Sequence, residues 1–337
     1  MVAMGGGRER RGAGPLGPGP VVRPLRPTDL VMLPSFWRDG DRRELTVPPW
    51  PRVCPEGGDL SLGSLFAAAV AQPSIRARLW VAVDGGAIVG VARGRPRSQG
   101  LVWDVSHLYV RAGSEDVVQT LLDRVCQQAL SEGARRVFLE LRPDVCDEAV
   151  RRAGFTRYCA REFYVLREGV AVQPGAPLAG RRRSQRDEVP LFLLYNAAVP
   201  LPVRTAEAMT REEWTALYRG RYQRSPSLLR ECQQYVWDAD DAVVGWAELL
   251  VGQRGQCFEI LVHPRWEDRT EGMVRFALAK CSPRTPVFTV AREYQATLRE
   301  RLDAMGFEAL ATGRMYVRQL ASRSAQPSLA PAVARLC

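Results

Sequence analysis

Two titratable side chains occupy matched positions in this chain, and both have the chemistry of a general base. His107 lies three residues before Val110, and Glu259 lies three residues before Val262, each near the end of an apolar run that predicts a strand. A side chain at such a place can accept a proton from a nucleophile bound beside the strand. Glu259 is the stronger candidate because its two neighbours are apolar, which makes a carboxylate a better base. Asp104 is a secondary candidate. For each of them, a solvent-facing position or a structural hydrogen bond is the alternative interpretation.

The matched positions belong to a long internal repeat. Val110 precedes Gly154 by 44 residues, and Val262 precedes Gly306 by the same 44 residues. In each copy phenylalanine follows the glycine directly, and a tyrosine follows it by ten residues. The offset of about 152 residues is too long for a solenoid unit, so it predicts the duplication of a domain.

The apolar patterns of the two copies predict the same order of elements. We expect hairpins over residues 79–94 and 235–250, central strands over 101–110 and 256–262, long helices over 116–132 and 270–280, short helices over 147–153 and 296–305, and last strands over 162–166 and 314–319. Residues 189–198 suit a strand or a helix, and the pattern leaves both open. Thr210 and Glu213 have the spacing of a capping box, which predicts a helix over 211–217.

These elements group into two domains, which fits a length of 337 residues. We predict an N-terminal repeat at residues 20–168 and a C-terminal repeat at 189–320, joined by a linker at 169–188. Residues 1–19 are mostly Gly, Pro and Arg, a composition typical of a disordered tail. Residues 321–337 form a second, polar tail.

The net charge of +10 does not by itself predict a nucleic-acid partner. Lys280 is the only lysine among 47 basic residues, and the arginines are spread along the whole chain. A GC-rich genome produces this bias, so a solvated surface explains the charge; an anionic partner, such as coenzyme phosphates, is the alternative. No apolar run approaches the ~18 residues of a membrane span. No apolar stretch follows the N-terminal arginines either, so we expect a cytoplasmic protein without a membrane partner.

The eight cysteines form no CxxC pair and have no regular spacing. Zinc sites and disulfide frameworks need such spacing, and the two histidines do not complete a metal cluster. We therefore expect no metal cofactor, and free thiols that serve as small core residues in a reducing compartment.

The order of elements resembles that of the GCN5-related N-acetyltransferase (GNAT) family, twice over. Residues 108–110 (Leu-Tyr-Val) and 261–264 (Leu-Val-His-Pro) are similar to the end of the fourth strand of that family. The Gly-Phe pairs at 154–155 and 306–307 are similar to its terminal motif. The resemblance implies a mixed α/β fold of two tandem GNAT-like acyl-CoA N-acyltransferase domains. Each would be a twisted mixed sheet flanked by helices, and the two would pack as a pseudo-symmetric pair.

The resemblance also implies where acetyl-CoA, the co-substrate, would bind. In the family, the fourth strand pairs with the pantetheine arm, and the following loop and helix N-terminus bind the pyrophosphate. The residues at these places are Leu261, Val262, Arg269 and Gly272 in the C-terminal repeat, and Tyr109, Val110 and Gly113 in the N-terminal repeat.

Both loops depart from the family pattern. Glu267 stands where the family has an arginine, and Glu115 and Asp116 place negative charge at the start of the first long helix. Carboxylates there are also ordinary helix caps, so capping competes with phosphate binding. Many family members have a tyrosine, the acid for the leaving thiolate, four residues before the Gly-Phe pair. Val150 and Leu302 stand there and donate no proton.

The activity that the resemblance implies is acyl-CoA-dependent N-acyltransfer: acetyl transfer from acetyl-CoA to a small-molecule or protein amine, with Glu259 or His107 as the base. We expect the C-terminal repeat to be active because it keeps Val262, Gly272 and Glu259. One alternative is a non-catalytic GNAT-like protein that binds a ligand or partner, and another is a structural pair without coenzyme. We expect a monomer with two pseudo-symmetric domains, or a weak dimer.

Overall fold

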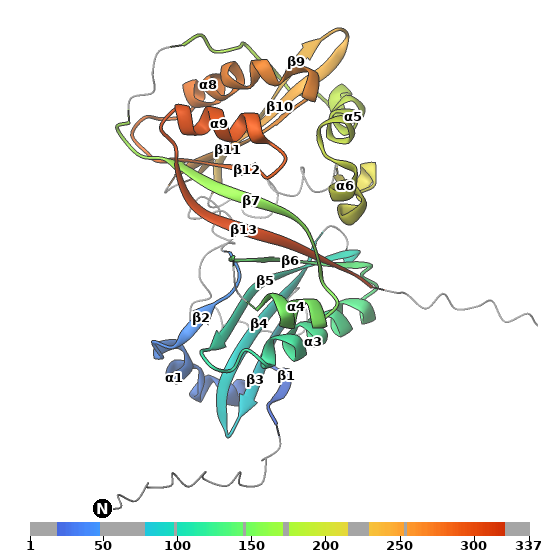
Figure 1. Cartoon of the computed structure of the whole chain (residues 1–337), viewed down its shortest axis with the longest axis vertical. Helices are drawn as coiled ribbons and strands as arrows, with labels where there is room; N and C mark the ends of the chain where they lie inside the picture. The colour runs from blue at the N-terminus through green and yellow to red at the C-terminus, as the bar shows by residue number, and fades with distance from the viewer. Residues whose placement is uncertain are drawn as a thin grey trace, which may run out of the picture.

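The computed structural model describes residues 19–47, 78–97, 100–143, 146–170, 175–214, 229–252 and 255–320. Within them, 13 strands form one continuous sheet with helices on both faces (Figure 1). Most of the two predicted tails, and residues 215–217 of the helix predicted after Thr210, lie outside the described residues.

The N-terminal repeat follows the predicted order of elements. It contains β1 (Val21–Pro24), the 3-10 turn η1 (Pro27–Val31), α1 (Leu33–Arg38), β2 (Arg42–Glu44), β3 (Arg78–Asp84), β4 (Ala87–Arg97), β5 (Val102–Arg111), α3 (Val117–Ser131), β6 (Arg136–Leu141), α4 (Asp147–Arg152) and β7 (Thr156–Leu166).

The C-terminal repeat has the same order. It contains β8 (Arg181–Arg182), η4 (Gln185–Asp187), α5 (Glu188–Ala198), α6 (Leu201–Glu207), β9 (Leu229–Ala239), β10 (Ala242–Gly252), β11 (Gln256–Val262), η5 (Pro264–Arg269), α8 (Thr270–Lys280), β12 (Val287–Arg292), α9 (Ala296–Ala304) and β13 (Glu308–Gln319).

Residues 189–198, for which the sequence left strand and helix open, form helix α5. Its residues Leu191, Leu194 and Tyr195 are buried and recur at helical spacing, so one face of the helix meets the sheet. The predicted capping box is also present. The Thr210 Oγ1 accepts a hydrogen bond from the Glu213 N–H at 3.1 Å, and the Glu213 carboxylate accepts one from the Thr210 N–H at 3.0 Å.

Each repeat contains a glycine where the long helix crosses the second strand of the hairpin. A Cβ atom on Gly90 would lie 2.9 Å from the Leu121 Cδ1 of α3, and one on Gly245 would lie 2.6 Å from the Met273 Cε of α8. Distances this short are overlaps, so a hydrogen at these positions lets helix and sheet approach closely. Close packing of the long helix on the hairpin therefore explains why a glycine occupies this position in both copies.

The two repeats exchange their last strands at the centre of the sheet. The strand order there is β6-β13-β7-β12, so β13 of the C-terminal repeat pairs with β6 of the N-terminal repeat. In return, β7 of the N-terminal repeat pairs with β12 of the C-terminal repeat. Between these contacts β7 and β13 pair with each other in antiparallel fashion, side by side across the middle of the molecule (Figure 1).

The repeated tyrosines travel with the exchanged strands. Tyr316 packs in the core under α3, and Tyr164 packs in the core under α8 and α9, so each core contains a tyrosine from the other repeat. The Tyr316 hydroxyl donates to Asp147, and the Tyr164 hydroxyl donates to Glu162, both at 2.6 Å. Burial and these bonds give both tyrosines a structural role.

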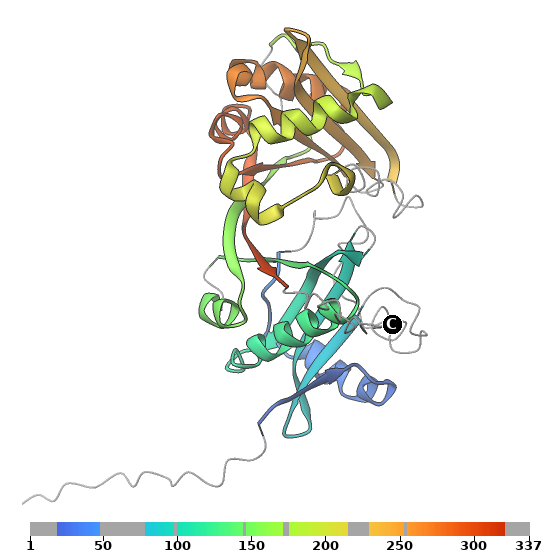
Figure 2. The same cartoon turned by 90° about the vertical axis from the view of Figure 1, so that its right-hand side faces the viewer.

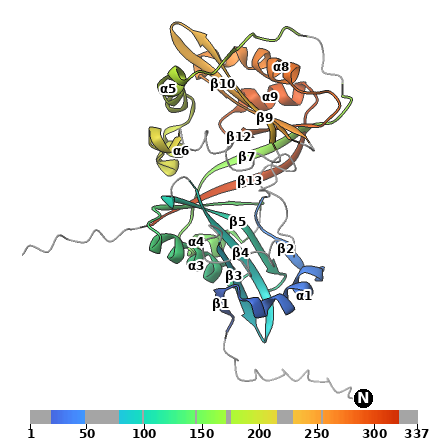
Figure 3. The ribbon, with the colours of Figure 1, turned by 180° about the vertical axis from the view of Figure 1, so that it is seen from behind.

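Helices cover both faces of each half of the sheet. In the C-terminal half, α8 and α9 pack on one face and α5 on the opposite face, which the side view shows clearly (Figure 2). In the N-terminal half, α3 and α4 lie on one face, and α1 covers Tyr109 and the hairpin residues on the other (Figure 3). Among the described helices, none is long and apolar enough to cross a membrane.

We expect Gly90→Ala to lower the free energy of unfolding by about 1–3 kcal/mol, because the new methyl group overlaps the side chains of Leu121 and Val117. Urea denaturation of the purified chain measures this. Gly40→Ala is the matched control, since its Cβ would meet no atom within 4 Å. Equal stability losses in the two variants would contradict the packing argument.

Candidate functional site

Strand β11 loses its β12 partner before it ends. It pairs with β12 only from Gln256 to Phe258, but pairs with β10 as far as Val262. Successive strand residues turn their backbone groups to opposite sides. The His263 N–H donates to β10, so Val262 turns its backbone to the β12 side. We call the stretch after Phe258, on that side, the C-terminal strand gap; within the described residues no strand pairs there.

Side chains, rather than a strand, reach into the C-terminal strand gap. The Gln295 amide, just before α9, donates to the Ile260 carbonyl at 3.0 Å, and the Thr289 hydroxyl donates to the Phe258 carbonyl at 2.9 Å. Of the two predicted coenzyme residues on this strand, Val262 turns its backbone to the gap. Leu261 pairs with Trp246 of β10, and its side chain packs toward α5.

Near the start of α8 two carboxylates are bonded, and two arginines have no ion pair among the described residues. Glu267 accepts a hydrogen bond from Thr297 at 2.6 Å, and Glu271 pairs with Arg275 at 2.8 Å. Arg269 stacks over the Trp266 ring at 4.0 Å. Within the described part of the chain, neither Arg265 nor Arg269 forms an ion pair, so two arginines, with the exposed Asp268 between them in sequence, lie at the start of α8 without a carboxylate partner.

Gly272, expected to contact the pyrophosphate, has a packing role. The Leu178 N–H of the linker donates to the Gly272 carbonyl at 2.9 Å, and the Trp237 indole holds the Leu178 carbonyl. A Cβ atom at Gly272 would lie 2.9 Å from the Leu178 Cβ. A substitution such as Gly272→Glu would therefore displace the linker whether or not a coenzyme binds, and it cannot serve as a test of coenzyme binding.

Glu259 lies on the α5 face of the sheet, in a row of polar side chains. It is half-buried and sits directly across from Glu248 of β10, which in turn sits across from Gln234 of β9. Glu248 is 1% exposed and accepts a hydrogen bond from the Gln234 amide at 2.7 Å. The sequence analysis did not find Glu248, because only the register of the hairpin places it beside Glu259.

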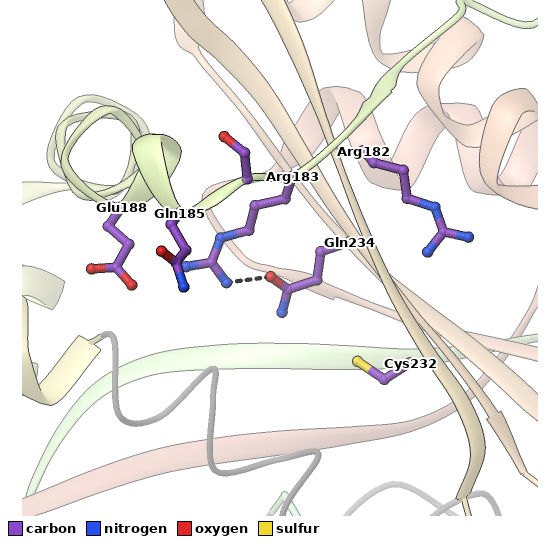
Figure 4. Close-up of a pocket in the computed structure, with 7 residues that line it drawn as sticks. Arg182, Arg183, Gln185, Glu188, Cys232 and Gln234 are labelled. Atoms are coloured by element: carbon purple, nitrogen blue, oxygen red, sulfur yellow. Dashed lines mark hydrogen bonds between the residues drawn. The ribbon is translucent and has the colours of Figure 1, made fainter.

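A pocket of about 440 Å³ opens at the far end of this row, between the start of α5 and strand β9 (Figure 4). Its lining residues are Arg182, Arg183, Ser184, Gln185, Glu188, Cys232 and Gln234. The Arg183 guanidinium donates to the Gln234 side-chain oxygen at 2.5 Å (Figure 4). The pocket therefore connects by hydrogen bonds through Gln234 to Glu248.

Asp187 holds the edge of this pocket in place. It accepts two hydrogen bonds from Arg181 at 2.8 Å and one from the Ser184 N–H at 2.6 Å. These bonds, that of Arg181 first, hold the pKa of Asp187 well below its usual range. Because Arg181 also pairs with Asp238 of β9, the segment that presents Arg183 is fixed to the strand it faces.

The corresponding gap in the N-terminal repeat is filled by the chain itself. Strand β5 pairs with β6 only from Val102 to Val105, and beyond that β2 pairs with β5. The Leu45 N–H donates to the Leu108 carbonyl at 2.9 Å, and the Leu108 N–H donates to the Thr46 hydroxyl at 3.2 Å. Thr46 also bridges to Leu141 of β6, so residues 42–47 join the two strands.

The predicted coenzyme residues of the N-terminal repeat lie against this inserted segment. Val110 pairs with Arg43 and Tyr109 with Glu44, so β2 occupies the backbone side that the resemblance assigned to pantetheine. Gly113 forms a tight turn with φ of 83° after β5. The adjoining Ala112 N–H donates to the Asp41 carbonyl, so this loop too is bound to the inserted segment.

His107 does not share a site with Glu259. It is 1% exposed on β5, lies 3.1 Å from the Ser106 hydroxyl and stacks on Tyr109 with ring centroids 6.2 Å apart. Five strand spacings separate β5 from β11, which corresponds to roughly 24 Å. Asp104, the secondary candidate, forms an ion pair with Arg97 at 2.6 Å.

The acid positions and the thiols also have plain structural roles. Val150 and Leu302 are fully buried core residues. Cys126, Cys159 and Cys257 are buried free thiols, and burial raises the pKa of Cys126 to about 12. Among the described residues, no group of three or more His, Cys, Asp and Glu side chains is placed to hold a metal ion.

The fold is that of solved acetyltransferases. The GCN5-related N-acetyltransferase from Sphaerobacter thermophilus matches with a TM-score of 0.54 at 13% identity, over 89% of this chain and 95% of that one. A tandem GNAT protein from the clavulanic acid biosynthesis pathway has a TM-score of 0.48 at 15% identity, over 90% and 99% of the two chains. No protein-family model matches the sequence, and no curated protein matches it. The chain has the GNAT fold in two tandem copies, so the predicted fold is confirmed.

We expect Asp187→Asn to lower the free energy of unfolding by about 1–3 kcal/mol at pH 7, because Arg181 and Ser184 lose a charged acceptor. The pKa of Asp187 is lower in the folded chain than in the unfolded chain. The contribution of the Asp187 carboxylate to the free energy of unfolding is therefore complete above its pKa in the unfolded chain, about 3.9. It is lost as the pH falls toward the lower pKa of Asp187 in the folded chain. Urea denaturation at pH 7 and pH 3 should show that the difference from wild type narrows at pH 3. Asp41→Asn is the control, since Asp41 is exposed and has no ion pair among the described residues.

Proposed function

We propose that this protein is an acyl-CoA-dependent N-acyltransferase, which transfers an acetyl group from acetyl-CoA to an amine, with one active site in the C-terminal repeat. One observation carries the proposal: β11 separates from β12 after Phe258 with no strand of the described residues between them, and Glu259 lies on the adjoining stretch of β11. The similarity to solved acetyltransferases at 13% identity supports the fold and leaves the activity as our inference.

In this proposal the pantetheine arm pairs with the backbone of Val262 in the C-terminal strand gap. The pyrophosphate lies at the start of α8, where Arg265 and Arg269 have no carboxylate partner among the described residues. Backbone N–H groups at a helix N-terminus attract anions. Because Glu267 is bonded to Thr297, its charge is turned toward α9.

The chemical step needs one base beside the thioester. The amine nitrogen attacks the thioester carbonyl carbon, the C–S bond breaks, and coenzyme A leaves as a thiolate. Glu259 accepts the proton that the amine loses. The thiolate takes a proton from water, since a thiol with a pKa near 8.5 is a good leaving group that does not require a tyrosine at Leu302.

Only one coenzyme is expected per chain. In the N-terminal repeat residues 42–47 occupy the backbone side of β5 that a pantetheine arm would need. The acceptor would be a small-molecule or protein amine that reaches Glu259 from the α5 face.

A non-catalytic ligand-binding protein is the second candidate. It is favoured by Leu302, a fully buried residue at the position where the resemblance implies the tyrosine acid. It predicts acetyl-CoA binding without turnover, so binding and catalysis must be measured separately.

Calorimetric titration of acetyl-CoA into the intact chain tests the coenzyme site. We expect micromolar binding with one coenzyme per chain, and the double substitution Arg265→Gln with Arg269→Gln should weaken it by about tenfold or more through loss of phosphate contacts. Arg284→Gln, an exposed arginine after α8, is the control and should leave the affinity unchanged. Absence of binding would refute the proposal, and two coenzymes per chain would refute the closure of the N-terminal repeat.

Steady-state acetylation of a panel of amines tests the base. We expect Glu259→Gln to lower kcat by roughly 10²–10⁴-fold with unchanged acetyl-CoA affinity, because the amide cannot accept the proton. Glu231→Gln is the matched control, since Glu231 lies in the same hairpin but is exposed on the opposite face of the sheet. Binding without turnover in the wild type would favour the second candidate.

A further inference from the structure

The pocket between α5 and β9 contains a cation, Arg183, that no carboxylate of the described residues neutralises. Arg183 is half-buried, and its guanidinium has one hydrogen-bond partner, the neutral side chain of Gln234. The Arg183 Nε is buried and has no hydrogen-bond partner in the part of the chain that the structure describes. Among the described residues no carboxylate forms an ion pair with Arg183, although a charge removed from water needs one. This arrangement indicates a site for an anionic group.

The cation is held in a fixed orientation. Its backbone is positioned by Asp187, which binds the neighbouring Arg181 and Ser184. On its other side, Gln234 is held by the buried Glu248 at 2.7 Å. In Figure 4 the Arg183 side chain turns toward Gln234, while Arg182 points away from this cluster. A guanidinium fixed in this way presents its remaining N–H groups to the pocket at little entropic cost.

The pocket lies on the same sheet face as Glu259, at a distance set by the strands. Gln234, Glu248 and Glu259 are direct neighbours across three strands, so two strand spacings, roughly 10 Å, separate the first from the last. The pocket lining ends at Gln234, so a ligand with its amine at Glu259 and its anionic group at Arg183 must span a similar length and pass over the buried Glu248. Glu188 also lines the pocket, and its negative charge favours a singly charged carboxylate over a phosphate.

We propose that the acceptor is an amino carboxylate with several carbons between its two ends, whose carboxylate binds Arg183 while its amine is placed at Glu259. The length corresponds to 6-aminohexanoate or to the ε-amine of free lysine, and exceeds that of an α-amine beside its own carboxylate. This inference rests on the proposed acyltransfer for the role of the amine, but the carboxylate site can be tested without turnover.

The kinetic test compares 6-aminohexanoate with hexylamine, which has the same chain without the carboxylate. In the wild type with acetyl-CoA we expect kcat/KM to be at least about tenfold higher for 6-aminohexanoate, the gain of one charge-assisted pair. In Arg183→Gln the two amines should become equal, and Arg183→Lys should keep part of the preference. Arg186→Gln is the control, because Arg186 is an exposed neighbouring arginine that does not line the pocket, and it should leave the preference unchanged.

A binding test separates this inference from the proposed function. Calorimetry of 6-aminohexanoate with the coenzyme-free chain should show binding that Arg183→Gln abolishes and Arg186→Gln preserves, with thermal melting to verify that each variant is folded. Such binding without any acetyl transfer would refute the proposed function and support the carboxylate site. Acetyl transfer with equal kcat/KM for both amines in the wild type would support the proposed function and overturn this inference. Equal binding of 6-aminohexanoate and hexylamine would also overturn it.

Discussion

The pairing of β7 with β13 is the interaction on which the rest of the structure depends. These two strands are the last of their repeats, and each lies between the other and a strand of the opposite repeat. Removing either one would leave an interior strand with an unpaired edge in the middle of the sheet. Because Tyr316 and Tyr164 are carried into the opposite cores, hydrophobic packing is shared as well as hydrogen bonding. The two repeats are therefore one structural unit, although the chain is built from two similar halves.

The same feature of the fold has different consequences in the two repeats. In each, a parallel strand pair ends early, and the backbone groups beyond it need new partners. In the N-terminal repeat Leu45 and Thr46 supply them, and the inserted segment joins β5 to β6. In the C-terminal repeat the Gln295 side chain bonds one carbonyl. The two repeats therefore differ in what bonds the backbone at the end of the central strand: a chain segment in the N-terminal repeat, and side chains in the C-terminal repeat.

The polar row on the α5 face links the proposed base to the proposed carboxylate site. Arg183, Gln234 and Glu248 are joined by two hydrogen bonds, and Glu259 is the next residue across the sheet. A buried polar network of this kind is stable only when its members are satisfied. The N–H groups of Arg183 that have no partner among the described residues lie at one end of the row, and Glu259 lies at the other; in our proposal a zwitterionic ligand binds both ends.

The sequence by itself determined the elements and the duplication. Helix α3 and the hairpins follow from apolar periodicity and turn residues, which act over a few neighbouring positions. The equal spacing of the Gly-Phe pairs at 154–155 and 306–307 from the central strands indicated the duplication. The sequence also placed Glu259 and Val262 on one strand.

Only the tertiary structure decided which strands pair across the repeats, and that residues 42–47 fill the space between β5 and β6. It also decided that Leu178 covers Gly272 and that Glu248 lies beside Glu259. Each of these depends on contacts between residues far apart in the chain. A sequence pattern, which reports local periodicity, does not contain the register that brings such residues together.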